Sequence, residues 1–268
     1  MLPYHQSVIG RIAKGLAVAG ILSAACLGAG PRTWADAPLA APPLEARALA
    51  PALPIVAIPA RGPAPQPFVA LLLTGDGGYG LFDRAVSRQL ASHGIPVVAV
   101  NMLRYFWRRK DPDAVARDME RILAEYCDAW GRDRVILIGH SLGADVMPFI
   151  VSRLAPEALE RVDTIALLGP ARSVDFKFHL SYWLRGGKVR YPMSVEEEVQ
   201  KLDGSKILCV RGDKEKHSLC STADNEGMVV ESVHGGHAFR KHHEVIGDMI
   251  LDRVLGMTGA PVESAGGF

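Results

Sequence analysis

A glycine-flanked serine is the residue of this sequence best placed for chemistry. The segment Gly139-His140-Ser141-Leu142-Gly143 follows an apolar run at 135–138 and precedes a helical pattern that reaches about residue 154. A serine nucleophile needs a sharp strand-to-helix turn that lifts its hydroxyl clear of the backbone, and glycines flank it because larger side chains would collide. The helix N-terminus also favours developing negative charge. We predict that Ser141 is a nucleophile; the alternative is a tight turn without chemistry.

The base and the acid are expected after the serine, since Ser–acid–His is the chain order of α/β-hydrolases. His237 follows two glycines just beyond the last predicted strand and is the predicted base, with His234 as the alternative. Two carboxylates follow the strand at 207–210. Glu215 stands three residues past Gly212, the usual offset for the acid in this fold, and is preferred to Asp213.

Acyl transfer also requires backbone N–H groups that stabilise an oxyanion. The amide of Leu142, directly after the serine, is one predicted donor. The turn Gly75-Asp76-Gly77-Gly78, after the apolar run at 68–73, supplies the second, from Asp76 or Gly77. The alternative is a plain glycine turn. A phosphate-binding loop is disfavoured because no Gly-Lys-Ser/Thr follows.

Three further groups of side chains are candidate ligands. Asp145 lies one helical turn beyond the serine, and Asp76 flanks the oxyanion turn, so either could hold a substrate ammonium group. The alternatives are a helix-start charge and a turn-stabilising side chain. In the run 104–110, basic residues flank three aromatic residues, and Arg108 and Arg109 are candidates for contact with an anionic lipid or phosphate headgroup. The alternative is aromatic packing beneath an exposed basic loop.

Metals, cofactors and nucleic acids are not expected as ligands. His237, His242 and His243 lack zinc-ligand spacing, because the pattern His-Glu-x-x-His is absent. The formal net charge of +1 provides no basic excess for nucleic acid.

The surrounding elements predict an α/β-hydrolase fold, with a mostly parallel sheet covered by helices on both faces. Apolar strand patterns alternate with amphipathic helices, as parallel sheets require. Such sheets bind ligands beyond the carboxyl ends of their strands, where the candidate residues fall. The strands are expected at 68–73, 96–100, 135–138, 164–168, 207–210 and 228–232, and the helices at 81–92, 111–130, 141–154 and 242–255.

The domain boundaries follow from composition. Residues 1–35 combine basic residues, a short apolar run and small residues, which predicts a cleaved signal peptide and a periplasmic location. A Pro/Ala-rich linker is expected at 36–66, with a possible edge strand at 53–58, then the hydrolase domain at 67–258 and a flexible tail at 259–268. In an oxidising compartment, Cys209 and Cys220 are the expected disulfide, leaving Cys127 in a helix; two free thiols are the alternative.

These motifs resemble those of the VirJ/AcvB family of bacterial virulence-associated proteins, in its single-domain form. The resemblance runs from about residue 54 to the last helix. The pieces that carry it are Thr74-Gly75-Asp76-Gly77-Gly78, Leu103-Arg104-Tyr105-Phe106-Trp107, Gly143-Ala144-Asp145-Val146-Met147-Pro148, Ser218-Leu219-Cys220 and Gly235-Gly236-His237.

The resemblance implies an exported protein linked to type IV secretion, with secretion-system proteins as partners. It also implies hydrolysis of aminoacylated phosphatidylglycerol, notably lysyl-phosphatidylglycerol, with Ser141 matching the family nucleophile and His237 the family histidine. Departures from the family pattern at Tyr79, His140, Leu142 and Ala238 concern the pocket more than the reaction.

Overall fold

The computed structural model describes residues 53–62, 64–177, 193–222, 225–239 and 242–256. Within these ranges, seven strands form one sheet in the order β1-β3-β2-β4-β5-β8-β9, in which β1 is antiparallel to β3 and every other pair is parallel. The strands are β1 Ile55–Ile58, β2 Phe68–Leu73, β3 Val97–Val100, β4 Arg134–His140, β5 Val162–Leu168, β8 Ile207–Gly212 and β9 Val229–Val233. The mostly parallel sheet is therefore confirmed. The predicted signal peptide, the linker up to residue 52 and the tail at 259–268 lie outside the described residues.

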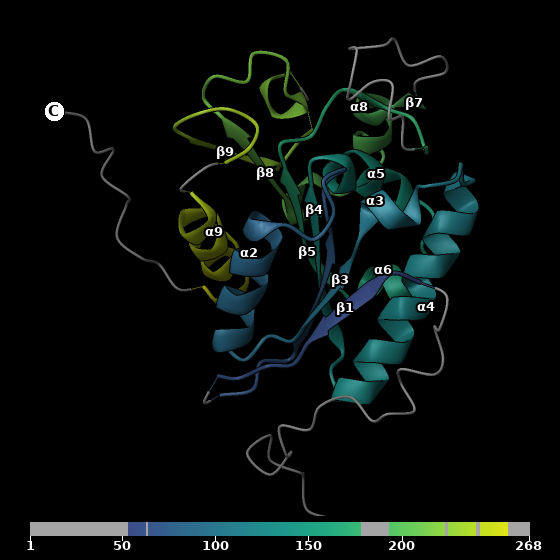
Figure 1. The fold of residues 1–268 in the computed structure, drawn as a ribbon, viewed down its shortest axis with the longest axis vertical. Coiled ribbons are helices and arrows are strands. Elements are labelled where there is room, and N and C mark those ends of the chain that lie inside the picture. The colour runs from purple at the N-terminus through teal and green to yellow at the C-terminus, as the bar shows by residue number, and fades with distance from the viewer. Residues whose placement is uncertain (1–52, 63, 178–192, 223–224, 240–241, 257–268) are drawn as a thin grey trace, which may run out of the picture. The chain divides into compact units, whose positions relative to one another are not determined.

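Helices cover both faces of the sheet, as predicted (Figure 1). Helices α2 (Leu81–Ser92) and α9 (His243–Leu255) pack together on one face, and α4 (Pro112–Trp130) and α5 (Leu142–Val151) pack together on the other. The shorter elements are α3 Met102–Tyr105, α6 Pro156–Glu160, α8 Val195–Val199, η2 Gly204–Lys206, η3 Leu219–Ser221 and the pair β6 Ser173–Val174 and β7 Met193–Ser194. No helix in the described part of the chain combines the length and apolar character that crossing a bilayer requires.

The central strand β2 explains why the sheet has two cores. All six of its residues are buried, because it lies between β3 and β4 with helices on both sides. Alternate side chains along a strand point to opposite faces. The odd-numbered residues of Phe68–Leu73 accordingly join the core under α4 and α5, and the even-numbered ones join the core under α2 and α9.

The strand register brings the chemically interesting segments to one edge. Leu73 at the end of β2 pairs with Gly139 of β4, so the glycine turn after β2 begins beside the serine turn. His140 pairs with Leu168 at the end of β5, and Gly212 at the end of β8 pairs with Val233 at the end of β9. The carboxyl ends of β2, β4, β5, β8 and β9 therefore meet, as expected for a ligand-binding edge.

The helix boundaries follow local capping. Asp111 caps α4 by accepting hydrogen bonds from the amides of Asp113 and Ala114, Pro112 occupies the first turn, and Gly131 ends the helix in the left-handed region at φ 60°. In the run 104–110, the first residues belong to α3, and Tyr105 and Phe106 are buried in the core. This agrees with the aromatic packing expected from the sequence as the alternative.

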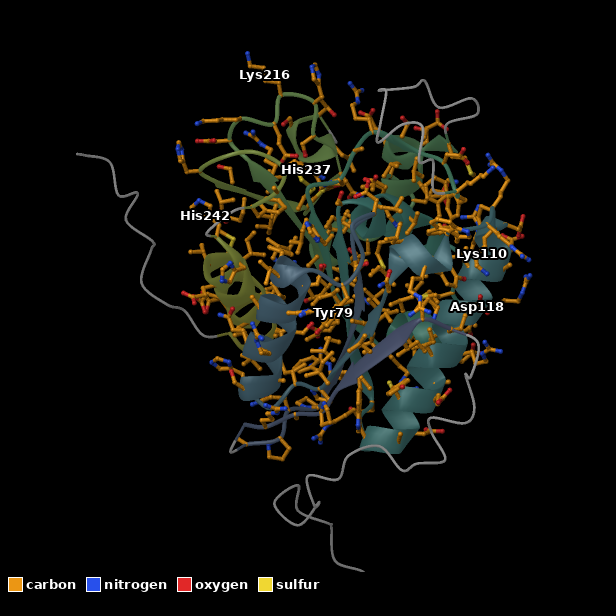
Figure 2. All side chains as sticks on the ribbon, in the orientation of Figure 1. Tyr79, Lys110, Asp118, Lys216, His237 and His242 are labelled. Atoms are coloured by element: carbon orange, nitrogen blue, oxygen red, sulfur yellow. A yellow bond between two sulfur atoms is a disulfide. The ribbon has the colours of Figure 1, made fainter. Side chains whose placement is uncertain are left out.

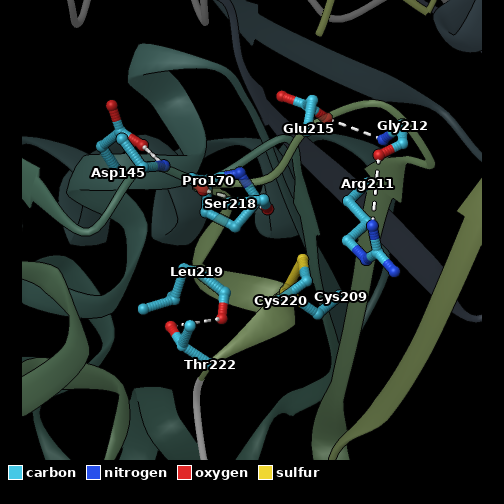
Figure 3. The surroundings of a disulfide bond; sticks show 11 residues. Asp145, Pro170, Cys209, Arg211, Gly212, Glu215, Ser218, Leu219, Cys220 and Thr222 are labelled. Atoms are coloured by element: carbon cyan, nitrogen blue, oxygen red, sulfur yellow. Dashed lines mark hydrogen bonds between the residues drawn. A yellow bond between two sulfur atoms is a disulfide. The ribbon is translucent and has the colours of Figure 1, made fainter. Parts of the chain in front are cut away.

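A disulfide joins Cys209 of β8 to Cys220 of η3, as predicted, and Cys127 is a buried free thiol in α4 (Figure 3). The bridge closes a short loop, residues 210–219. A disulfide stabilises a fold chiefly by restricting the unfolded chain, and a loop of this length corresponds to roughly 3 kcal/mol.

Replacing both cysteines, as Cys209→Ser with Cys220→Ser, is expected to lower the free energy of unfolding by about 2–3 kcal/mol. Urea denaturation followed by tryptophan fluorescence measures the change. The wild type in reductant should approach the midpoint of the double variant, which reductant itself leaves unaltered. A wild-type midpoint that does not respond to reductant would contradict a stabilising role for the bridge.

Candidate active site

The serine turn has the strained geometry that a nucleophile requires. Ser141 has φ 53° and ψ −118°, a region that L residues rarely adopt. Glycines flank it for a steric reason: a Cβ at Gly139 would collide with the backbone of Ala144, and one at Gly143 would overlap the carbonyl of Leu73. The Ser141 amide donates to the Leu168 carbonyl at 2.9 Å, which anchors the turn to the end of β5.

Ser141, His237 and Glu215 form a continuous hydrogen-bonded chain. Ser141 Oγ lies 2.7 Å from His237 Nε2, and His237 Nδ1 lies 2.7 Å from Glu215 Oε1. The second oxygen of Glu215 accepts the Gly212 amide at 2.7 Å, so both oxygens of this carboxylate are used (Figure 3). A proton on Nδ1 leaves Nε2 free to accept from the serine hydroxyl.

A glycine allows the imidazole to reach the serine. His237 follows β9, which lies at the edge of the sheet and is separated from β4 by β5 and β8. Its ring passes over the end of β5 at Gly169, where an added Cβ would lie 3.1 Å from Nδ1. Gly169 has φ 65°, so this position favours glycine on backbone grounds as well.

Asp213 and His234, the alternative acid and base, are bonded to each other instead. Asp213 Oδ2 lies 3.0 Å from His234 Nδ1, and Asp213 Oδ1 accepts the Gly235 amide at 2.9 Å. The structure thus brings Glu215, not Asp213, to His237. The Asp213 carboxylate ties the loop after β8 to the loop that carries His237.

The hydrogen bonds between Ser141, His237 and Glu215 accompany shifts in the pKa values of both His237 and Glu215. The bond to Glu215 is the largest reason why the pKa of His237 lies above its ordinary 6.5; burial opposes the shift, and the charges of Asp145 and Asp76 add to it. Burial alone would raise the pKa of Glu215, but the bonds from His237 and Gly212 outweigh it and hold that pKa below its usual range. Glu215 is therefore ionised at neutral pH and makes His237 a stronger base.

The two turns that carry the predicted oxyanion donors lie against each other. A Cβ added to Gly75 would lie 3.2 Å from Ser141 Cβ, so the glycine turn begins directly beside Ser141. The Gly143 amide donates to the Thr74 carbonyl at 3.1 Å and holds the two turns together. Leu142 is the first residue of α5, where an amide has no acceptor within the helix.

Asp145 is close enough to interact electrostatically with both His237 and Asp76. One of its oxygens accepts the Ala171 amide at 2.6 Å. Loss of solvation by burial raises the pKa of Asp145 to about 7. A carboxyl group in this state favours a cation beside it, because a positive charge offsets the lost solvation.

The arginines predicted to contact a substrate phosphate are placed differently. Both guanidinium nitrogens of Arg109 bind the buried carboxylate of Asp175, at 2.5 and 2.8 Å, so this side chain is committed within the protein. The neighbouring Lys110 lies over the Tyr105 ring, and its ammonium group pairs with the Asp118 carboxylate (Figure 2). Arg108 is exposed. Arg109 is therefore held by a residue 66 positions later in the chain, and its contact with a substrate phosphate stays a prediction.

A histidine–aspartate pair beneath the serine turn was not identified from the sequence. His140 Nδ1 lies 3.0 Å from Asp83 Oδ1, and the ring packs against Phe82 with centroids 4.3 Å apart. Asp83 also accepts the Gly80 amide at 2.9 Å. The pair fixes the residue before Ser141 to the start of α2. Fifty-seven positions separate its members, so no local motif indicates it.

Metal ligation has no structural support among the described residues, where no group of three His, Cys, Asp or Glu side chains is arranged for it.

Solved structures define the class of the fold. Est1E from Butyrivibrio proteoclasticus superposes with a TM-score of 0.51 at 15% identity, covering 75% of this chain and 93% of that one. Proline iminopeptidase from Mycobacterium smegmatis gives a TM-score of 0.53 at 11% identity, covering 75% of this chain and 95% of that one. LpqC, a poly(3-hydroxybutyrate) depolymerase from Bordetella parapertussis, gives a TM-score of 0.51 at 14% identity, covering 78% of this chain and 86% of that one. Together with the sheet order and the serine turn, these likenesses show an α/β-hydrolase fold.

The family follows from the sequence. The family described as bacterial virulence protein (VirJ) matches residues 67–257, and the chain belongs to this family. A search of curated protein sequences finds no match.

The two carboxylates near His237 can be separated without an activity assay. Glu215→Gln is expected to make His237 titrate at lower pH, because the largest cause of its raised pKa is removed. Asp213→Asn, the matched control on the same loop, should leave the titration almost unchanged. NMR of the His237 ring protons against pH measures both. Equal shifts in the two variants would contradict the pairing of His237 with Glu215.

Proposed function

We propose that this protein is a serine hydrolase that cleaves the ester of an amino acid, with Ser141 as nucleophile, His237 as base and Glu215 as acid. The observation that carries the proposal is the chain of two 2.7 Å hydrogen bonds running from Ser141 Oγ through His237 to Glu215, on a strained turn. A purely structural turn has no need of a φ of 53° at a serine facing an imidazole.

The reaction follows the order of proton transfers that this geometry allows. Ser141 Oγ attacks the ester carbonyl while His237 Nε2 takes its proton, and Glu215 stabilises the resulting imidazolium. The amide of Leu142, together with that of Asp76 or Gly77, stabilises the oxyanion. His237 then gives the proton to the leaving alcohol oxygen as the acyl–oxygen bond breaks. Water attacks the acyl-enzyme by the same route, releasing the free acid and restoring Ser141.

Acidic groups beside the nucleophile support a cationic acyl group. Asp145 and Asp76 lie within electrostatic range of each other and of His237, and the pKa of Asp145 is raised to about 7 by burial. An ammonium group placed there would relieve the cost of charging Asp145. This agrees with an aminoacyl ester, and the VirJ/AcvB resemblance favours lysyl-phosphatidylglycerol in particular.

Two exposed apolar side chains, in the segments that follow β2 and β3, support a membrane-bound substrate. Leu81 begins α2 and is 85% exposed, and Trp107 follows α3 and is 65% exposed. Tryptophan suits a lipid interface because its ring is apolar and its N–H is polar. Arg108, next to Trp107, adds a positive charge that an anionic lipid surface attracts.

The proposed setting is the periplasm, reached through the signal peptide predicted at 1–35. The Cys209–Cys220 disulfide is compatible with that compartment, because structural disulfides persist where the environment is oxidising. Secretion-system proteins are proposed partners on the strength of the family resemblance.

The decisive comparison uses the wild type and Ser141→Ala on purified lysyl-phosphatidylglycerol and on a small aryl ester. The wild type should hydrolyse the lipid, and the variant should lose at least about 10³-fold in kcat. Released lysine measures the first reaction and absorbance the second. Turnover of the aryl ester alone would favour a general esterase. No turnover of either, with secretion unaffected by the variant, would favour a non-catalytic role.

Asp145→Asn tests the ammonium site. At pH 8, above the pKa of about 7, wild-type Asp145 is mostly ionised. The variant should raise KM for lysyl-phosphatidylglycerol roughly tenfold, since a hydrogen bond to a charged group is lost. The matched control is Asp128→Asn, an exposed residue near the end of α4, which should change nothing. An unchanged KM in Asp145→Asn would reject this role.

A further inference from the structure

A cavity of about 450 Å³ adjoins His237. Two loops form its walls: the backbone at 169–171, after β5, and the residues at 214–218, after β8. Its volume is in the range of small-molecule sites. Glu215 is the carboxylate that lines it, and both of its oxygens are occupied by His237 and the Gly212 amide.

The place of this cavity relative to the imidazole gives it a role in the proposed reaction. The proton on Nε2 must pass to the leaving oxygen, so the leaving alcohol has to lie beside His237. The cavity borders this residue. An alcohol extending from the scissile oxygen into it would lie beside His237; the Asp145 carboxylate borders the wall at 169–171, where it accepts the Ala171 amide.

The cavity wall carries positive charge. Lys214, Lys216 and His217 line it and are exposed. Across the described residues, neither Lys214 nor Lys216 takes part in an ion pair with a carboxylate. Figure 2 shows Lys216 at the top of the molecule, above His237, and on a different side of the molecule from Lys110 and Asp118. The Lys214 charge acts on the neighbouring Asp213 carboxylate and helps to lower its pKa, but the two form no ion pair among the described residues, so both ammonium groups can still bind an anion.

The loop that carries these lysines is held in place at both ends. The Leu219 amide donates to the Pro170 carbonyl at 2.9 Å, and the Ser218 hydroxyl donates to the same oxygen at 3.3 Å. The Cys209–Cys220 disulfide closes the loop, and the Lys214 amide donates to the Gly235 carbonyl at 3.0 Å. Both walls of the cavity are thus linked to each other through Pro170 and Ser218 (Figure 3), and the lysine loop is linked to the loop of His237 through Gly235.

We propose that this cavity is the leaving-group site and that Lys214 and Lys216, with His217, select an alcohol bearing a phosphate. The inference rests on the proposed ester hydrolysis and deepens it. It moves phosphate recognition from Arg109, which is bound to Asp175, to the loop after β8. The ester would then be recognised by opposite charges on its two halves: carboxylates for the aminoacyl group and lysines for the phosphate.

Three lysyl esters test the proposal: lysyl-glycerol, lysyl-glycerophosphate and lysyl-phosphatidylglycerol in mixed micelles. The variant Lys214→Gln with Lys216→Gln should lower the ratio of kcat/KM for lysyl-glycerophosphate to that for lysyl-glycerol about tenfold, and the lipid should lose as much. Raising the salt concentration should reduce the wild-type preference, because exposed charges are screened. Arg117→Gln with Arg121→Gln on α4 is the matched control and should leave the ratio unaltered.

An unchanged ratio for lysyl-glycerophosphate would overturn the proposal. A loss confined to the micellar lipid would do so as well, because it would assign the lysines to surface attraction instead of phosphate binding.

If the wild type hydrolyses none of the three esters, the proposed function fails, and the site is tested separately. Glycerophosphate titrated into the wild type should then shift the amide resonances of residues 214–218, and should not do so in the lysine variant. Identical spectra with and without glycerophosphate would also reject the proposed phosphate site.

Discussion

The hydrogen bond between Ser141 and His237 is the interaction around which the rest of the site is arranged. It joins residues 96 positions apart, which the sheet places at the ends of β4 and β9 with two strands between them. Parallel pairing brings the ends of these strands to one edge, and Gly169 leaves room for the ring to cross β5. A bulkier residue at Gly169 would obstruct the imidazole without touching the serine.

The loop after β8 then controls the properties of that imidazole. It supplies Glu215, which raises the pKa of His237, and Asp213, which holds the neighbouring loop through the Gly235 amide. The two carboxylates, only two positions apart, thus have separate tasks. Glu215 affects the proton on His237, and Asp213 affects the position of the loop that carries His237.

Much of the fold and the central residues could be predicted from the sequence, because their signals are local. The apolar runs, the Asp111–Pro112 start of α4 and the glycines around Ser141 each depend on residues within one or two turns of one another. The preference for Glu215 over Asp213 came from an offset of three residues. The ion pair of Arg109 with Asp175 could not be predicted because the partner is distant in the chain, and local spacing carries no information on such pairs. The His140–Asp83 pair was missed for the same reason. The cationic wall at 214–218 depends on which two loops face each other, which only the tertiary structure shows.

The backbone of Ser141 has a thermodynamic consequence. A non-glycine residue at φ 53° and ψ −118° raises the energy of the native state by about 1–3 kcal/mol relative to a relaxed conformation. The buried strands on either side and the bond to the Leu168 carbonyl must outweigh this cost in every folded molecule. Glycine at position 141 would therefore relieve the strain of the native turn, but it would also give the unfolded chain more conformational entropy. The free energy of unfolding of such a variant would report the balance between these two effects. The position is one where folding efficiency and reactivity favour different residues.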